Sequence, residues 1–374
     1  MKKMRYLAYL PLLIILLCGC KNARTGGAKG EGDTLRMSHA TNITMVRYPH
    51  YTVVTLKNPW KQDAILATYV LVERKDSAQA SHLPNGIVLY TPLRRNIVFT
   101  TSHAYLMEML GCRKTIVGVA DAKYMLIPDI KKRLGKDITD VGNSMKPDFE
   151  RIIDLRPDAV WLSPFDNGGS YGTLENTDIP VIACADYMET SALGRAEWMK
   201  FYALLLGSEA RAQQLYTQME RNYNALSARA RHAKRTLSVL PDKLVSNVWY
   251  VPGGKSSAGM LYHDAYGHYA YLNDGHSGSL ALPFEQVLDK MGNADFWLIC
   301  QNGPLNKRML GSEYEGYAAM KPYKTGEIYY CRVDSVPYFE QQSWRPDLLL
   351  HDLVQLFHPD LKLGKLYFYK KLTH

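Results

Sequence analysis

The stretch GSEARAQQLYTQMERNYNALSARARHAKR, residues 207–235, decides the fold, because after its first residue it predicts one long helix without glycine or proline. Ser208 is the expected N-cap, and Glu209 adds a favourable charge to the first turn. About 25 residues at ~1.5 Å each span roughly 38 Å, longer than most globular helices. We therefore expect a rigid strut between two lobes, with function in the cleft between them. The apolar positions, at the three- and four-residue spacing of one helix face, are Ala212, Leu215, Tyr216, Met219, Tyr223, Leu226 and Ala230.

Strand-like and helix-like stretches alternate on both sides of this helix, which is typical of parallel βαβ construction. We predict an α/β fold of two Rossmann-like lobes with central, mainly parallel sheets, joined by the single long helix. The expected parts are an N-terminal lobe at 34–187, linking helices at 188–236 and a C-terminal lobe at 237–374. The expected strands are NIVFT (96–100), TIVGVA (115–120), ITDVG (138–142), AVWLSP (159–164) and IPVIACA (179–185) before the helix, and KLVSNVWYV (243–251), ADFWLIC (294–300) and GEIYYC (326–331) after it.

Three further segments complete the organisation of the chain. TVVTL (52–56) and AILATYVLVER (64–74) predict a β-hairpin within 34–84, added to the first lobe. ETSALGRAEWMKFYALLLG (189–207) predicts an amphipathic helix that leads into the strut. HDAYGHYAYLN (263–273) predicts a short helix in the second lobe.

The N-terminus predicts export. MKKMRY supplies a basic start and LAYLPLLIILL an apolar run that is short for a membrane span, which favours a signal peptide at 1–19. Leu17 to Cys20 resembles a lipobox, so Cys20 is the expected lipidation site, followed by a flexible tether at 20–33. An uncleaved anchor or a plain signal peptide are the alternatives. We expect an extracytoplasmic, membrane-anchored lipoprotein.

Composition limits the possible functions. With 47% hydrophobic and 22% charged residues, the chain is a folded body rather than a disordered one. The net charge of +9 falls to about +6 once the signal leaves, and it is spread along the chain, so we expect no nucleic-acid partner. Cys300 and Cys331 each end a predicted strand and either form a disulfide or remain buried thiols. No cysteine or histidine spacing predicts a metal site.

Five stretches together resemble the helical-backbone substrate-binding proteins of ABC importers. The resemblance implies a ferric siderophore, haem or cobalamin as transported ligand, an ABC permease dimer with its cytoplasmic ATPase as partner, a monomer, no cofactor and no enzymatic activity. Residues 34–84 lie outside the common pattern. The stretches are RRNIVFTTSHAYLMEMLGCRKTIVGVA (94–120), MKPDFERIIDLRPDAVWLSP (145–164), ETSALGRAEWMKFYALLLG (189–207), LPFEQVLDKMGNADFWLI (282–299) and RPDLLLHDLVQLFHPDL (345–361).

Two glutamates in these stretches stand near the start of short predicted helices. The resemblance implies that Glu150 and Glu285, one on each lobe, form salt bridges to arginines of the two permease subunits. The alternative is that each acid only compensates its helix dipole. The second match departs from the pattern, because Pro283 stands two residues before Glu285, whereas Pro147 stands three before Glu150.

Ligand is expected at loops that follow the carboxyl ends of the strands. Aromatic walls with a few polar groups suit a large planar or chelated ligand, and an arginine can pair with its negative charge. If the ligand is haem, a tyrosine or histidine coordinates its iron, with His103, Tyr250, His263 and His268 as candidates. The predicted contacts are Ser102, His103, Tyr105, Asp121, Tyr124, Asn143, Phe165, Asp166, Trp249, Tyr250, Tyr262, His263, Gln301, Asn302, Tyr338, Trp344 and Arg345, with Ser102 also as a helix N-cap.

Searches for catalytic signatures give no convincing match. HExxH and CxxC do not occur, and GGSYG at 168–172, which fits the GxSxG spacing, is interpreted as a loop rather than a nucleophile elbow. GGKSS at 253–257 is not a P-loop because Trp249 replaces the required upstream glycine. The alternative functions are an extracytoplasmic chelatase or hydrolase on the same fold, or a surface lipoprotein that binds without transport.

Overall fold

A computed structural model describes residues 32–79, 82–165, 174 and 176–373. The predicted signal peptide, Cys20 and Asp166 lie outside the described residues. Within the described ranges, no helix combines the length and apolar character that crossing a bilayer requires. Residues 32–374 form one compact unit.

The chain begins with a five-stranded sheet in the order β1-β2-β3-β4-β5. The two strands expected in segment 34–84 are β3 and β4, which pair antiparallel. The sequence did not predict the other three strands, of which β1 has only three residues and β5 joins the sheet in parallel with β4. The bounds are β1 (Asp33–Leu35), β2 (Ile43–Arg47), β3 (Thr52–Lys57), β4 (Ile65–Glu73) and β5 (Ile87–Thr91).

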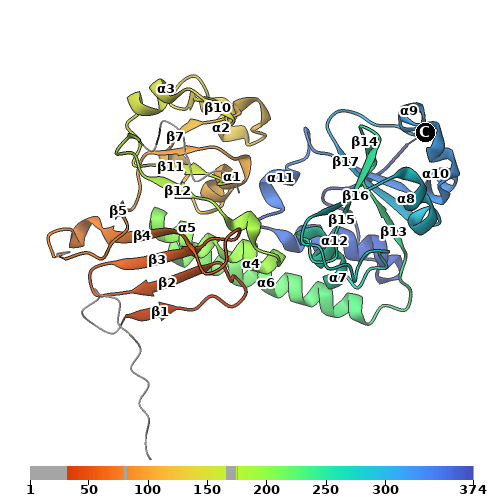
Figure 1. The fold of residues 1–374 in the computed structure, drawn as a ribbon, viewed down its shortest axis with the longest axis horizontal. Helices are drawn as coiled ribbons and strands as arrows, with labels where there is room; N and C mark the ends of the chain where they lie inside the picture. The colour runs from red at the N-terminus through yellow and green to blue at the C-terminus, as the bar shows by residue number, and fades with distance from the viewer. Residues whose placement is uncertain (1–31, 80–81, 166–173, 175, 374) are drawn as a thin grey trace, which may run out of the picture. The chain divides into compact units, whose positions relative to one another are not determined.

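A second sheet, in the order β12-β11-β6-β7-β8, is parallel throughout and confirms the predicted α/β construction (Figure 1). Its first helix, α1, is capped by Thr100, whose hydroxyl accepts a hydrogen bond from the His103 amide. The prediction of Ser102 as N-cap was therefore wrong: Ser102 lies inside the first turn and is buried. The bounds are β6 (Asn96–Val98), α1 (Thr101–Met109), β7 (Ile116–Val119), α2 (Pro128–Arg133), β8 (Thr139–Asp140), β9 (Gly142–Asn143), β10 (Lys146–Pro147), α3 (Phe149–Asp154), β11 (Ala159–Leu162) and β12 (Val181–Ala183).

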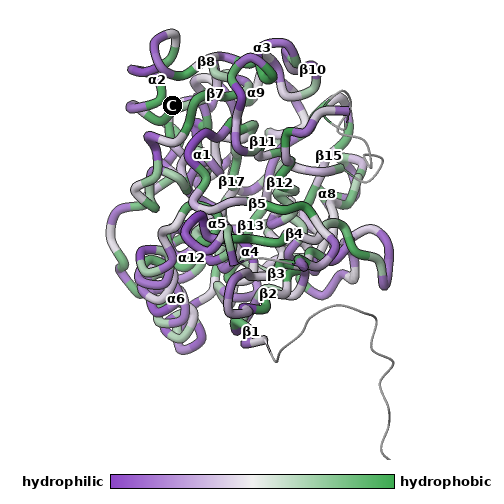
Figure 2. The backbone as a smooth tube through the Cα atoms, turned by 90° about the vertical axis from the view of Figure 1, so that its left-hand side faces the viewer, coloured by the Kyte–Doolittle hydropathy of each residue, from purple (hydrophilic) through white to green (hydrophobic). Residues whose placement is uncertain are grey.

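The long helix expected at 207–235 is α6, which has 23 residues and therefore spans about 35 Å. Ser208 occupies the N-cap position, but its side chain caps no amide among the described residues. Figure 2 shows mostly hydrophilic residues along α6, as expected of a helix that buries one face only. The helix expected at 189–207 divides at Trp198 into two shorter ones. The linking helices are α4 (Ala192–Glu197), α5 (Met199–Leu206) and α6 (Glu209–Arg231).

The second lobe has a mixed sheet, β13-β17-β18-β19, in which only the edge strand β19 is antiparallel. The stretch 243–251, predicted as one strand, is instead a hairpin of β14 and β15. Ser246 and Asn247 at its tip have φ values of 50° and 67°, the left-handed pair that a tight two-residue turn requires. The bounds are β13 (Val239–Pro241), β14 (Leu244–Val245), β15 (Val248–Pro252), β16 (Ser279–Leu282), β17 (Phe296–Gln301), β18 (Ile328–Arg332) and β19 (Lys370–Lys371).

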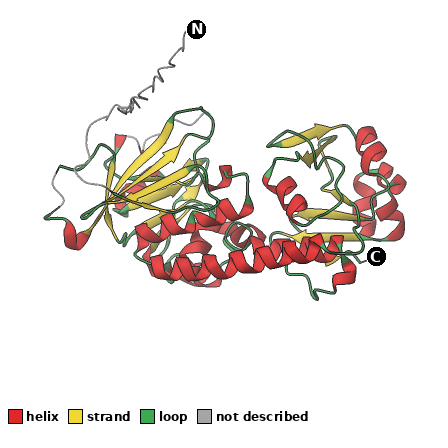
Figure 3. Ribbon diagram, turned by 90° about the horizontal axis from the view of Figure 1, so that it is seen from below, coloured by secondary structure: helices red, strands yellow, loops and turns green. Residues whose placement is uncertain are grey.

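The helices of the second lobe differ from prediction in one place. The helix expected at 263–273 lies earlier, because α7 ends at Asp264 and Tyr266 has a left-handed φ of 50°, which no helix continues through. The C-terminal helix α12 packs on α6, which also packs on α4 and α5 (Figure 3). The bounds are α7 (Ser257–Asp264), α8 (Phe284–Met291), α9 (Lys307–Glu313), α10 (Lys321–Thr325), α11 (Tyr338–Gln341) and α12 (Pro346–Phe357).

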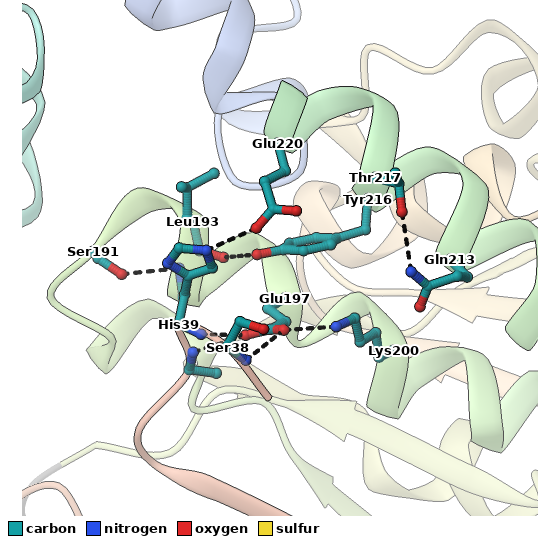
Figure 4. A network of polar contacts seen from close by, with 12 residues as sticks. Ser38, His39, Ser191, Leu193, Glu197, Lys200, Gln213, Tyr216, Thr217 and Glu220 are labelled. Atoms are coloured by element: carbon teal, nitrogen blue, oxygen red, sulfur yellow. Dashed lines mark hydrogen bonds and ion pairs between the residues drawn. The ribbon is translucent and has the colours of Figure 1, made fainter. Parts of the chain in front are cut away.

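Residues Ser38–Asn42, here called the N-terminal strap, hold the first sheet to the linking helices. The buried Glu197 carboxylate accepts hydrogen bonds from the amides of Ser38, His39 and Ala40 at 2.9, 2.7 and 2.9 Å, and from Lys200 at 2.6 Å (Figure 4). The buried Glu189 carboxylate accepts from the next two amides, at 3.0 and 2.8 Å. Two buried carboxylates therefore satisfy five consecutive backbone amides, which the sequence pattern did not predict.

Candidate functional site

A cavity of about 170 Å³, here called the α4–α7 pocket, lies where helix α4 meets the second lobe. The residues that line it are up to 178 positions apart in the chain, from Ser191 to Tyr369. Its walls carry three tyrosines and aliphatic side chains, and Arg195 is the one charged residue among the described residues that line it. The lining residues are Ser191, Ala192, Arg195, Ser257, Ala258, Leu261, Tyr262, Tyr338, Gln342, Leu349, Leu353 and Tyr369.

Arg195 is held from behind by a buried polar cluster. Its Nε lies 3.2 Å from Oδ2 of Asp186, whose Oδ1 accepts hydrogen bonds from His103 Nε2 at 2.8 Å and from the Tyr202 hydroxyl at 2.9 Å. Burial alone would lower the pKa of His103, but Cys184 and Asp186 outweigh it and raise that pKa to about 10. Burial likewise opposes ionisation of Asp186, yet the charge of His103 holds the Asp186 pKa below its ordinary value. The cluster is thus an ion pair that fixes the arginine at the pocket wall.

The three tyrosines of the pocket are neutral hydrogen-bonding groups. Burial raises the pKa values of Tyr262, Tyr338 and Tyr369 well above the ordinary tyrosine value, so none supplies a phenolate at neutral pH. Together with Leu349 and Leu353 they give an apolar wall with a few hydroxyl groups. One guanidinium and such a wall suit an anionic or carbonyl-rich ligand with aromatic or aliphatic parts.

Helix α11 and the turn that follows it join the second lobe to the first lobe. The Trp344 indole donates to the Ser102 carbonyl at 2.7 Å, and Gln341 donates to the Tyr105 hydroxyl at 3.1 Å. The first contact joins two predicted residues that lie 242 positions apart in the chain, and the second joins predicted Tyr105 to Gln341, which was not predicted. These residues are hydrogen-bonded to one another and do not line the α4–α7 pocket.

Four predicted contact residues are buried in packed surroundings. Trp249 and Trp344 are 0% exposed, and Ser102 and His103 are 9% and 3% exposed. Trp249 stacks on Trp297 within the second-lobe core, and His103 bonds to Asp186. In this structure the surfaces of these four residues are covered by protein and His103 is paired with Asp186, so their contact with ligand stays a prediction.

The remaining predicted residues divide between the α4–α7 pocket and the surface. Tyr262 and Tyr338 line the pocket. Arg345 is paired with Asp347 at 2.8 Å, Asp121 accepts from the Ser144 amide at 3.2 Å, and Tyr105 bonds to Gln341. The side chain of Gln301 donates to the carbonyl of Pro304 at 3.4 Å. The exposed ones are Tyr124, Asn143, Phe165, Tyr250, His263 and Asn302, together with the further iron-ligand candidate His268.

The two predicted docking glutamates occupy equivalent places in the two lobes. Glu150 lies in the first turn of α3 and Glu285 in the first turn of α8, and both are exposed. Neither makes an ion pair with another described residue, so each carboxylate is free to meet a partner.

Sequence reasoning predicted only Tyr262 and Tyr338 among the residues that line the pocket, and the most informative of the missed ones are Arg195 and Tyr369. Arg195 lies in the predicted linking helix, in the stretch SALGRAEW, where a charged residue among apolar ones was the available signal. Tyr369 belongs to the C-terminal segment LYFYKK, which holds three consecutive aromatic residues, but nothing local predicts its position beside α7.

Comparisons with known proteins agree with this architecture. Residues 97–334 match a family model described as periplasmic binding protein, which begins after the first five-stranded sheet. An uncharacterised lipoprotein of Methanocaldococcus jannaschii is 25% identical over 75% of this chain and 69% of its own length. Among solved structures, a siderophore-binding protein of Vibrio cholerae bound to Fe³⁺-Desferal has a TM-score of 0.54 at 17% identity, covering 71% of this chain and 99% of its own. A periplasmic haem-binding protein of Pseudomonas aeruginosa has a TM-score of 0.57 at 16% identity, covering 75% and 99%.

Proposed function

The chain belongs to the periplasmic binding protein family, and we propose that it is the extracytoplasmic substrate-binding lipoprotein of an ABC importer. It captures an iron chelate, either a ferric siderophore or haem, or cobalamin, and delivers it to the membrane permease. The observation that carries this proposal is the family match over 97–334, which extends from the first parallel strand into the second lobe. The similarity to a protein named as a lipoprotein supports anchoring at Cys20.

Docking on the permease is assigned to Glu150 and Glu285. Each is an exposed, unpaired acid at the same place on its own lobe, so the two offer a matched pair of charges to a two-fold symmetric partner. Such contacts set orientation and association rate, because exposed charges act before close contact forms.

Ligand recognition is assigned to the α4–α7 pocket, with Arg195 as its charged group. The cavity of about 170 Å³ is smaller than ordinary small-molecule sites, so it takes one arm or one acidic group of a chelate rather than a whole molecule. Asp186 holds the arginine in place, so little side-chain entropy is lost when the ligand binds.

A titration separates transport binding from the two alternative functions. Ferric desferrioxamine, haemin and cyanocobalamin are each added to the purified protein, with tryptophan fluorescence followed alongside chromatography of the ligand. Saturable one-to-one binding of one of them, with the ligand recovered intact, is expected. Multiple turnover would instead identify an enzyme, and binding to none of the three would favour a surface lipoprotein of another kind.

Docking is tested by transport in cells. The double variant Glu150→Ala/Glu285→Ala is expected to abolish uptake while leaving ligand affinity unchanged. The matched control is Asp154→Ala/Asp289→Ala, which removes two exposed acids from the opposite ends of the same helices. Equal loss of uptake in both double variants, or loss of ligand affinity in the first, would refute the docking role.

A further inference from the structure

A second cavity, here called the sheet–helix pocket, lies between the N-terminal sheet and helices α5 and α6. Its volume is about 370 Å³, and it shares no residue with the α4–α7 pocket. One wall comes from β1, from Arg36 directly after it, and from β2, all of which precede residue 97, where the family match begins. This pocket is therefore built by a part of the chain that the matched family region does not include.

The inner surface of the sheet–helix pocket is apolar. Met45 and Leu204 line it and are only 1% and 9% exposed, and Leu35 stands directly opposite Met45 in the sheet register. Since residues in register share one face of a sheet, Leu35 and Met45 form a continuous apolar strip. The volume falls in the range of ordinary small-molecule sites, roughly 300–1,000 Å³.

The rim of the pocket carries excess positive charge. Arg36 and Arg47 line it, and neither guanidinium group makes a hydrogen bond or ion pair with another residue in the described part of the chain. Asp33 stands opposite Arg47 in the register without forming an ion pair with it, and Glu209 is the one carboxylate among the described lining residues. Two free guanidinium groups beside one carboxylate favour an anionic ligand.

Lys200, the third cation that lines the pocket, differs from the two arginines because its charge is already paired. Its ammonium lies 2.6 Å from Glu197 Oε1 and 4.7 Å from the centroid of the Tyr216 ring, so its charge is balanced and its position fixed (Figure 4). The same Glu197 holds the N-terminal strap, which leads into β2. The wall that carries the arginines is therefore held rigidly against the helices, and the pocket does not depend on a bound ligand for its shape.

We propose that the sheet–helix pocket binds an amphiphilic anion, a phosphate or carboxylate head group attached to an apolar chain. The head group lies between Arg36 and Arg47, whose planar guanidinium groups match the oxygens of either acid. The apolar chain lies along Met45 and Leu204. Such a molecule is either an acidic lipid of the membrane or a free acyl phosphate or fatty acid. The site is independent of ligand capture in the α4–α7 pocket.

The test uses the full chain carrying Cys20→Ser, which removes the lipidation site. Decyl phosphate, below its micelle concentration, is titrated by calorimetry, with decanol and inorganic phosphate as the matched probes that lack one half of the ligand. We expect saturable one-to-one binding of decyl phosphate and at least tenfold weaker binding of the other two. Arg36→Ala/Arg47→Ala should weaken decyl phosphate binding at least tenfold, because both arginines are exposed and their removal leaves the fold intact.

The control is Arg221→Ala/Arg308→Ala, which removes the same charge from two exposed sites elsewhere and should leave binding unchanged. Equal affinity for decanol and decyl phosphate, or equal losses in the two double variants, would overturn the proposal. Sedimentation with vesicles of phosphatidylcholine alone or mixed with phosphatidylglycerol distinguishes the source. Arginine-dependent binding to the acidic vesicles identifies a membrane lipid, and binding to decyl phosphate alone identifies a free ligand. Affinity for whichever of ferric desferrioxamine, haemin and cyanocobalamin the wild type binds should be the same in all variants.

Discussion

Replacing Glu197 by alanine should detach the N-terminal strap from the linking helices. The carboxylate is 0% exposed and accepts three backbone amides and the Lys200 ammonium, so the change leaves four donors without their acceptor. Removing one partner of a buried charged cluster costs about 3–5 kcal/mol, and we expect about 4 kcal/mol here. Glu197→Gln keeps one acceptor oxygen and the side-chain shape, and should cost about 2 kcal/mol.

The loss translates into a measurable shift of the melting temperature. For the compact unit Gly32–His374, an unfolding entropy of ~2.1 cal/mol/K per residue amounts to roughly 0.7 kcal/mol/K. A loss of about 4 kcal/mol therefore lowers Tm by about 6 °C, and a loss of about 2 kcal/mol by about 3 °C. Burial raises the pKa of Glu197, but Lys200 and the strap amides outweigh it and lower that pKa. The stabilisation is therefore present above about pH 4.3 and is lost as pH falls through the folded-state pKa.

Amide hydrogen exchange tests the mechanism directly. In Glu197→Ala the amides of Ser38, His39 and Ala40 should exchange faster, whereas those of Thr41 and Asn42 stay protected by Glu189. The complementary variant, Glu189→Ala, should expose the latter pair. Unchanged exchange at residues 38–40 in Glu197→Ala, or a Tm within 1 °C of wild type (an energy of only ~0.7 kcal/mol), would refute the reasoning.

Three other predictions follow from the pocket, its supporting cluster and the cysteines. Arg195→Ala should weaken binding of ferric desferrioxamine or haemin, whichever the wild type takes, by about 10- to 100-fold in a fluorescence titration. The reason is that a hydrogen bond to a charged group contributes about 1.5–3 kcal/mol. Arg195→Lys keeps the charge and should lose less affinity. The pKa of His103 is raised to about 10, so its stabilising effect is full below about pH 6.5 and disappears as pH rises towards 10; a Tm series over this range should decline in wild type and be flatter in Asp186→Asn. Cys300 and Cys331 stand opposite each other in the register of β17 and β18 as free thiols, so alkylation in denaturant without reductant should label both; labelling that needs prior reduction would show a disulfide.

The parallel sheet and the long helix were predictable because their signals are local. Strands such as β11 are short apolar runs between turn residues, and the buried face of α6 repeats at helical spacing. The hairpin at 243–251 was missed because its turn, Ser246-Asn247, lies inside an otherwise apolar run and replaces the usual glycine.

The site was less predictable because its position depends on tertiary contacts. The rule that ligands gather at the carboxyl ends of strands selected His103 and Trp249, but burial in the neighbouring core decides what such residues contact. His103 is bonded to Asp186, which is distant in sequence. Asp186 also bonds to Arg195 at the wall of the α4–α7 pocket, and no local pattern predicts either contact.

Helix α6 does more than connect the two lobes, because other elements are also hydrogen-bonded to its side chains. Its face carries Tyr223, which bonds to Asp264 of α7, and Asn222, which bonds to Asp347 of α12, so the second lobe is fastened to it. His39 of the strap bonds to Glu220 of the same helix at 2.8 Å, so the first sheet is fastened to it as well (Figure 4). A helix without glycine or proline bends little, and parts fastened to its adjacent turns cannot swing far relative to it. If Glu150 and Glu285 dock on the permease as proposed, these contacts to α6 limit how far their separation can change, and we expect ligand binding to shift it only slightly.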